Sequence, residues 1–167
     1  MRYRHNLVRR DSYLAFRVRA ETVGDLEVVS SMLQDAIVPI SETIFQPSKH
    51  WFVMMAQRFR WEGSPTLLPA GGHDEGETDE SRVSFERILC AVRVENVTDV
   101  RSTGIDLADR GQILELLSLH LAEGHLDLAF AGDKTIRLLT VKLSVHAEDI
   151  GEAWPTIQRP SHPGNEA

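Results

Sequence analysis

The residues best suited to acid–base or metal chemistry in this sequence are His120, His125 and Asp127. If the chain reverses at Glu123-Gly124, His120 and Asp127 become direct cross-strand neighbours, with Cβ atoms about 5 Å apart. Asp127 would then orient the imidazole and raise its pKa, as in half of a catalytic dyad. Together with His125, these residues are also candidate metal ligands. The alternative, a solvated ion pair worth roughly a few tenths of a kcal/mol, is favoured because no nucleophile or further ligand is placed nearby.

Two other groups have reactive residue types in less suitable surroundings. His73, Asp74 and Glu75 resemble metal ligands, but they lie in a stretch rich in glycine and acidic residues that would not hold a fixed geometry, which favours a solvated acidic run. Cys90 alternates with apolar residues of a predicted strand, and a thiol in such surroundings keeps a high pKa and little reactivity. We interpret Cys90 as a packing residue, since a nucleophilic role would need a histidine brought beside it by the fold.

The segment Gln57-Arg58-Phe59-Arg60-Trp61-Glu62 alternates cationic and aromatic side chains. Such a pattern can form an anion or peptide site in which arginine stacks on indole, so Arg58, Arg60 and Trp61 are candidate partner-binding residues. The simpler alternative is a strand with Phe59 and Trp61 in the core and the arginines in solvent.

We expect no metal ion or organic cofactor to be required, and we assign no cofactor-binding residue. A structural zinc site usually takes four cysteine or histidine ligands at short, paired spacings, whereas this chain has one cysteine and seven scattered histidines. Gly71-Gly72 precedes an acidic run, which would repel a nucleotide phosphate.

A hairpin over residues 117–130 would position the two histidines and Asp127. With the turn at Glu123-Gly124, every large apolar side chain falls on one face and the other face is polar, as in an antiparallel sheet with one buried side. The predicted apolar pairs are Leu121 with Leu126, Leu119 with Leu128, and Leu117 with Phe130.

The N-terminal half predicts a strand followed by a helix. Apolar residues alternate from Leu14 to Ala20, and the pattern then changes to helical spacing. Thr22 and Asp25 form a capping box, and an apolar stripe continues from Leu26 to Ile37, before Pro39 ends the helix. We therefore expect one helix after the first strand.

Several further segments predict strands. Residues 40–45 and 51–61 are rich in β-branched and aromatic residues and flank the turn-forming residues 46–49, which indicates a second hairpin. Residues 83–94 and the strand from Thr135 to Val145 each change which face is apolar part-way along, so a bulge or sharp bend is expected in each.

Strands that change face are needed when a small sheet curls over itself, because one strand then contributes to both halves of the core. We therefore predict an α+β fold with a curled antiparallel sheet, a small barrel or orthogonal sandwich that resembles pleckstrin-homology domains in outline. Residues 147–154, stopped by Pro155, are expected to form a short C-terminal helix.

Composition indicates one domain of an ordinary soluble protein, since the 167 residues are 42% hydrophobic and 26% charged. We expect a flexible basic tail over residues 1–11, a single domain over 12–157 with a mobile acidic loop at about 63–81, and a flexible tail over 158–167. No signal-peptide or membrane-spanning stretch is apparent, and the single cysteine fits a reducing compartment, so a cytoplasmic location is expected. The net charge of −7 argues against nucleic acid or membrane as partners.

Several short motifs are spread along the chain: Leu33-Gln34-Asp35-Ala36, Arg58-Phe59, Trp61-Glu62, Gly104-Ile105-Asp106, Phe130-Ala131-Gly132, Asp149-Ile150-Gly151 and Ala153-Trp154. With these motifs the chain resembles an uncharacterised bacterial family, domain of unknown function 2948, over residues 14–162. The chain departs from the family pattern at Gln57 and Arg60, where the pattern has Asn and Asp, and the charge change at Arg60 argues against transferring a site to this segment. The resemblance implies a small bacterial cytoplasmic protein and transfers no catalytic residue.

Two hypotheses for function follow. The first is a non-enzymatic protein-binding or regulatory module that presents a strand edge, or the segment from Arg58 to Trp61, to a protein partner or to copies of itself. The second is a small hydrolytic or metal-assisted enzyme that uses His120 with Asp127 and groups from distant strands. A concave, water-excluding pocket around His120 would favour the enzyme, and an open face would favour the module.

Overall fold

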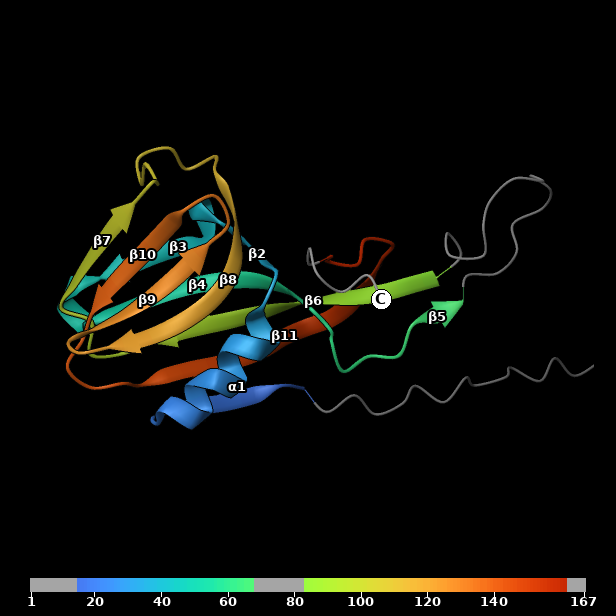
Figure 1. Ribbon diagram of the computed structural model, residues 1–167, viewed down its shortest axis with the longest axis horizontal. Helices are drawn as coiled ribbons and strands as arrows, with labels where there is room; N and C mark the ends of the chain where they lie inside the picture. The colour runs from blue at the N-terminus through green and yellow to red at the C-terminus, as the bar shows by residue number, and fades with distance from the viewer. Residues whose placement is uncertain (1–14, 68–82, 162–167) are drawn as a thin grey trace, which may run out of the picture.

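The computed structural model describes residues 15–67 and 83–161. The described part contains one α-helix, which is neither long nor apolar enough to cross a membrane, and an antiparallel sheet (Figure 1). The elements are β1 (Arg17–Ala20), α1 (Val23–Leu33), β2 (Ala36–Pro39), η1 (Ile40–Glu42), β3 (Thr43–Gln46), η2 (Pro47–Lys49), β4 (Trp51–Phe59), β5 (Thr66–Leu67), β6 (Val83–Val94), β7 (Asp99–Thr103), β8 (Ile113–Ala122), β9 (His125–Phe130), β10 (Lys134–Leu139) and β11 (Val145–Thr156).

The sheet is open. Its strand order is β1-β11-β6-β4-β2-β8-β9-β10-β7, with β3 also pairing β4 and β5 pairing β6, and every pair is antiparallel. The end strands β1 and β7 do not pair with each other in the described part of the chain. The predicted small barrel or orthogonal sandwich, and with it the pleckstrin-homology-like outline, is therefore wrong, because the sheet is neither closed nor strongly curled.

The changes of apolar face that suggested a curled sheet have other causes. In β6 the alternate residues Ile88, Cys90, Val92 and Val94 are buried. Phe85 is only partly buried and packs beside Phe59, with 5.5 Å between the two ring centroids. The second candidate is two strands, because β10 ends at Leu139 and the chain turns before β11 begins at Val145. Neither change of face requires the sheet to curl.

The predicted C-terminal helix over residues 147–154 is wrong, since this segment belongs to β11. Val145, Ala147 and Asp149 are buried and the residues between them are not, which is the two-residue period of a strand. β11 pairs with β6 along most of its length, and this pairing overrides the local helical propensity of alanine and glutamate. A β-bulge interrupts the ladder between Ile150 and Trp154.

The helix begins as predicted and ends earlier. The Thr22 hydroxyl accepts a hydrogen bond from the Asp25 N–H and the Asp25 carboxylate accepts one from the Thr22 N–H, which confirms the capping box. α1 ends at Leu33 because Asp35 adopts a left-handed conformation, with φ of 60°, and the following residues pair with β8 as β2. The buried residues of the helix are Leu26, Val29 and Leu33.

The hairpin of β8 and β9 has the predicted register near its turn, where Leu121 pairs with Leu126 and Leu119 with Leu128. The third predicted pair is wrong, because a bulge at Leu117 shifts Phe130 opposite Leu116. A bulge adds one residue to one strand and reverses the faces beyond it, so Leu116 is buried and Leu117 is 41% exposed. The hairpin of β3 and β4 is confirmed, with η2 as its turn.

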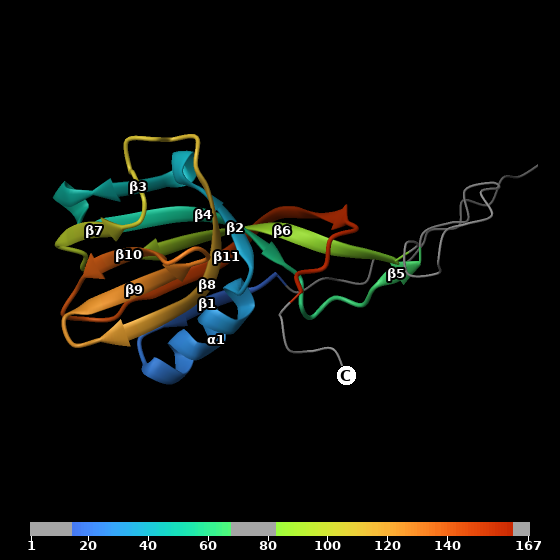
Figure 2. The same cartoon turned by 45° about the horizontal axis from the view of Figure 1, so that its top comes forward.

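Residues 83–87 of β6, residues 151–156 of β11 and the short β5 form a projection from the rest of the sheet, which we call the arm (Figures 1 and 2). The main core lies elsewhere, between α1 and the inner face of the sheet, and includes Leu33, Met54, Val92 and Leu128. The arm therefore depends on its own contacts for its geometry.

Candidate functional site

Arg58, Glu62 and Asp149 form a charged cluster with a buried centre, which we call the arginine triad. The side chains of Arg58 and Asp149 are 0% and 1% exposed, whereas that of Glu62 is 37% exposed. Nε and Nη2 of Arg58 donate to the two Asp149 oxygens, both at 2.7 Å. Nη2 and Nη1 donate to the two Glu62 oxygens at 2.6 and 3.1 Å. One guanidinium thus holds two carboxylates, each through paired charge-assisted hydrogen bonds.

Adjacent strands bring the triad together at the point where the main core meets the arm. Asp149 of β11 pairs with Cys90 of β6, which pairs with Ala56 of β4, so Arg58 lies two residues further along the same face. Phe16, next to β1, donates its N–H to Asp149 Oδ2 at 3.1 Å, and its ring centroid lies 5.1 Å from Arg58 Cζ. The triad therefore links β4 to β11, and Phe16 connects it to the residues that begin β1.

Both Arg58 and Glu62 are held in their charged forms. Burial alone would lower the pKa of Arg58, but the hydrogen bonds to Asp149 and Glu62 raise it above its ordinary value. Burial would likewise raise the pKa of Glu62, and its hydrogen bonds with Arg58 bring it below its ordinary value. Arg58 and Glu62 are therefore both charged at neutral pH.

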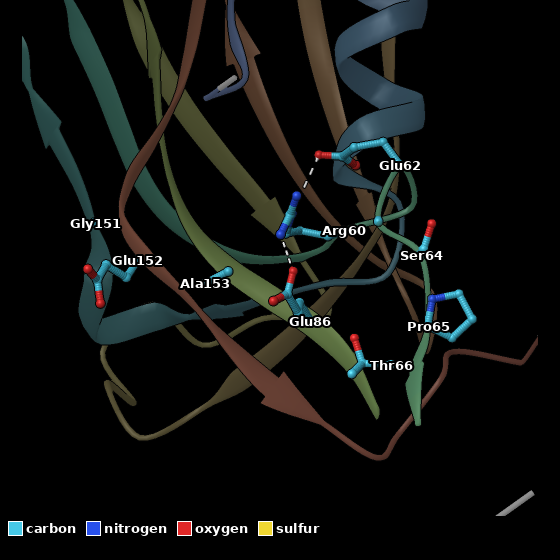
Figure 3. Close-up of a pocket in the computed structure, with 10 residues that line it drawn as sticks. Arg60, Glu62, Ser64, Pro65, Thr66, Glu86, Gly151, Glu152 and Ala153 are labelled. Carbon is cyan, nitrogen blue, oxygen red and sulfur yellow. Dashed lines mark hydrogen bonds and ion pairs between the residues drawn. The ribbon is translucent and has the colours of Figure 1, made fainter. Parts of the chain in front are cut away.

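A solvent-open cleft of about 700 Å³ lies where Glu62 reaches the surface of the arm, and we call it the arm cleft. Figure 3 shows Arg60 between Glu62 and Glu86, with residues 64–66 on one side and residues 151–153 on the other. The second wall is the bulge of β11, which begins directly after Asp149 and Ile150. The walls of the cleft thus come from two segments that the triad holds together.

The lining of the arm cleft is predominantly acidic. Three carboxylates, those of Glu62, Glu86 and Glu152, line it together with one guanidinium, that of Arg60. Arg60 is itself paired, because its Nη1 donates to Glu86 Oε2 and its Nε lies 4.0 Å from Glu62 Oε1. Among the side chains that line the cleft, negative formal charges therefore outnumber positive ones.

Several of the segments that carry the family resemblance meet in this region. The triad takes one residue from each of three of them, and Trp61 Nε1 donates at 3.3 Å to the carbonyl of Gln34 in a fourth. In a comparison with protein families, residues 16–162 match the family described as a protein of unknown function, DUF2948. The chain belongs to the DUF2948 family. Searches of the curated proteins and of the solved structures found no match.

In this DUF2948 protein the three predicted partner-binding residues have different environments. Arg60 lines the arm cleft, whereas Arg58 is buried and cannot meet a partner directly. Trp61 is partly buried, with its ring centroid 4.6 Å from that of Phe59. The sequence did not identify Asp149 as the partner of Arg58. The sequence pattern that could have found this pair is that Arg58 and Asp149 each occupy a position whose neighbours two residues away along the strand are buried. Two charged residues of opposite sign at such positions predict a buried ion pair.

The second predicted site in the DUF2948 protein is a surface ion network. His120 does pair with Asp127, but Asp127 accepts two hydrogen bonds, at 2.7 and 2.8 Å, from Arg137 of β10. His125 Nε2 lies 3.6 Å from the same carboxylate. The hydrogen bonds from Arg137 lower the pKa of Asp127, with smaller contributions from the two histidines. Across residues 15–67 and 83–161, no three His, Cys, Asp or Glu side chains are grouped as metal ligands.

The other candidate reactive residues of the sequence are Cys90 and the group at residues 73–75. Cys90 is buried, and burial together with the charge of Asp149 raises the pKa of its thiol to about 12. A thiol with that pKa is a poor nucleophile, which agrees with a packing role. His73, Asp74 and Glu75 lie outside the described residues, as does most of the predicted acidic loop.

Proposed function

We propose that this chain is a non-enzymatic protein-binding module of the bacterial cytoplasm, and that its arm cleft takes a positively charged, extended segment of a protein partner. The observation that carries the proposal is the lining of the cleft, where the carboxylates of Glu62, Glu86 and Glu152 outnumber the one guanidinium, that of Arg60. A lysine or arginine side chain entering the cleft could make charge-assisted hydrogen bonds to these carboxylates. Nucleic acid and anionic membranes are poor partners because they share the sign of the cleft.

The arginine triad supports a recognition role because it fixes the shape of the cleft. Removing Arg58 and Asp149 from water is costly, and a buried ion pair often gives no more stability than apolar residues of similar volume. The pair does, however, hold Glu62 on one side of the cleft and the start of the β11 bulge on the other. A preorganised cleft loses less entropy on binding, which raises affinity.

Apolar side chains near the cleft would add contact area for a partner. Ile150 is 46% exposed and Trp154 is 36% exposed, and these residues flank the part of the β11 bulge that lines the cleft. Strand addition to this edge is the less favourable mode, because Pro155 and the bulge remove regular hydrogen-bonding positions. We therefore favour recognition of a partner's side chains in the cleft itself.

Two other hypotheses, a small enzyme that uses His120 and Asp127 and a module that binds copies of itself, have weaker support. An enzyme using His120 and Asp127 would need the carboxylate that Arg137 already holds through two hydrogen bonds. Two copies that met through their arm clefts would bring like charges together.

The proposal can be tested with a defined peptide. The probe is a fluorescent twelve-residue peptide of lysine and alanine, compared by anisotropy with the same peptide carrying glutamate in place of lysine. The full chain should bind only the lysine peptide. The double substitution Glu86→Gln with Glu152→Gln should weaken binding about 3- to 10-fold, the effect of removing two exposed ion pairs.

A matched control is the double substitution Glu27→Gln with Glu123→Gln, which changes net charge equally at two exposed positions outside the cleft. This control should bind the lysine peptide as the wild type does. Equal binding of the two peptides, or equal loss of affinity in the two double variants, would contradict the proposal.

A further inference from the structure

The outer face of the sheet, opposite to the main core, is covered by no helix or other strand of the described chain. α1 packs on the inner face, where Leu26, Val29 and Leu33 belong to the main core. Along each strand, alternate residues point away from that core and keep part of their surface exposed. Six of these residues are apolar: Ile37 of β2, Ile44 of β3, Val53 and Met55 of β4, Ala91 of β6 and Ile113 of β8.

The apolar residues of the outer face form one continuous patch. Ile44 lies opposite Val53 on the next strand, and Met55 lies opposite Ala91. β2 connects these strands to β8 and its residue Ile113. Ile44 and Ile113 are 57% and 69% exposed. A contiguous exposed apolar patch marks a surface that binds another protein.

The central strands β4 and β6 have the composition of strands that are buried on both faces. Residues 51–56 read WFVMMA and residues 88–92 read ILCAV, without the alternation of apolar and polar residues expected of a sheet with one wet side. Within these runs, Met54, Cys90 and Val92 are buried in the main core. The residues between them, which include Met55 and Ala91, have apolar side chains that the described chain leaves uncovered.

Charged residues of opposite sign lie at the two sides of the outer face. Arg17 of β1 is level with Ala91, since both pair with Glu148 of β11. The side chain of Arg17 is 78% exposed, and its Nε lies 3.8 Å from Glu148 Oε1, too far for a hydrogen bond. On the other side, the exposed Glu115 of β8 pairs with Ile37. The two sides of the face can therefore pair with each other in a symmetric dimer.

A two-fold axis parallel to the strands, between β4 and β6, would bring both the apolar and the charged residues together. The strand order β1-β11-β6-β4-β2-β8 has three strands on each side of such an axis. The rotation lays β4 of one copy on β6 of the other, and β8 of one copy on β1 of the other. Met55 then faces the partner's Ala91, and Glu115 comes within reach of the partner's Arg17. Sheets packed face to face in this way lie about 10 Å apart, with side chains of the two faces interdigitated.

We propose that two copies of the chain pair through their outer faces in this two-fold arrangement. The inference goes beyond the proposed function, because none of the residues that define the outer face lines the arm cleft. It also differs from a pairing of the arm clefts, which would bring like charges together.

The size of the outer face predicts a weak dimer. Six strands about 4.8 Å apart and five residues of about 3.4 Å give a face of roughly 24 by 17 Å. This projected area is smaller than the about 800 Å² that each partner buries in a standard interface. We therefore expect a reversible dimer with a Kd of about 1–100 µM.

The first test is sedimentation velocity of the full chain at concentrations from about 2 to 500 µM, a range that spans the expected Kd. The average mass should rise from that of one chain towards twice that value. Ile44→Lys places a charge in the apolar patch and should raise the Kd at least about tenfold. The matched control is Val28→Lys on α1, because Val28 is 52% exposed and the change of charge is the same. This control should dimerise as the wild type does.

A charge swap tests the two-fold arrangement itself. Symmetry gives each dimer two pairs of Glu115 with Arg17, so Glu115→Arg alone and Arg17→Glu alone should each raise the Kd about 3- to 10-fold. The variant that carries both changes restores opposite charges and should return the Kd to within about twofold of the wild-type value. A wild type that stays monomeric at the highest concentration would overturn the inference. Equal effects of Ile44→Lys and Val28→Lys, or a double charge variant as weak as the single ones, would overturn it as well.

Discussion

Replacing Arg58 with methionine should lower the free energy of unfolding by about 3–5 kcal/mol, the usual effect of removing one partner from a buried ion pair. The structure gives the reason. Asp149, whose side chain is 1% exposed, would lose the two hydrogen bonds of 2.7 Å that Arg58 donates to it. Its charge would then be buried without the guanidinium that faces it in the native protein.

The double replacement of Arg58 by methionine and Asp149 by leucine should be less destabilising than the loss of Arg58 alone. No charge then remains in the buried centre, and Glu62, which is 37% exposed, can turn to solvent. We expect a coupling energy of at least about 2 kcal/mol between the two positions, in the range found for residues in direct contact.

Urea unfolding of the wild type, the two single variants and the double variant provides this measurement. The matched control is Arg137→Met, because Arg137 binds Asp127 with the same two-point geometry at 2.7 and 2.8 Å but is 46% exposed. Its replacement should cost far less, since exposed ion pairs contribute little. The reasoning fails if both arginine replacements have the same effect, or if the losses at Arg58 and Asp149 are simply additive.

Three further outcomes are expected. Leu33→Ala should cost about 2–5 kcal/mol, since Leu33 is 0% exposed, and exposed His120→Ala less than about 0.5 kcal/mol; equal losses in urea unfolding would mean that the core is wrongly assigned. Folding lowers the pKa of Glu62, so the stability that its charged form contributes is complete above the ordinary pKa of 4.5 and is lost as pH falls through the folded-state pKa. When urea unfolding is measured from pH 7 down to pH 3, the variant Glu62→Gln should therefore lose less stability than the wild type. Native Cys90 should resist iodoacetamide at pH 8, because a pKa of about 12 leaves roughly a thousandfold less thiolate than an ordinary cysteine; labelling at the unfolded rate would contradict this.

Features with local causes were predictable from the sequence. The capping box of Thr22 and Asp25 involves residues three apart, and the hairpin at Glu123-Gly124 pairs residues within a few positions of its turn. In both, the responsible side chains are neighbours in the chain, so composition and spacing were sufficient. The first error in the hairpin occurs at Leu117, where the bulge depends on what packs beside the strand.

Prediction failed where a distant partner determines the local structure. Residues 147–154 have the composition of a helix, but the neighbouring strand β6 makes them part of β11. Likewise Asp35 ends α1 in a left-handed conformation, and the residues after it pair with β8 instead of continuing the helix. Local propensity is a weak preference of a few tenths of a kcal/mol per residue, and tertiary pairing outweighs it.

In the candidate site, too, the local features were predictable from the sequence and the long-range contacts were not. The sequence alone indicated that the segment from Arg58 to Trp61 was unusual, and it correctly placed His120 opposite Asp127. Only the tertiary structure shows that Arg58 is buried against Asp149, 91 residues away, and that the arm cleft forms beside that pair. The physical reason is that a charged side chain can be buried at low cost only when a partner of opposite charge is buried beside it. The strand order of the whole sheet decides which two segments meet, and residues far apart in the chain therefore become partners.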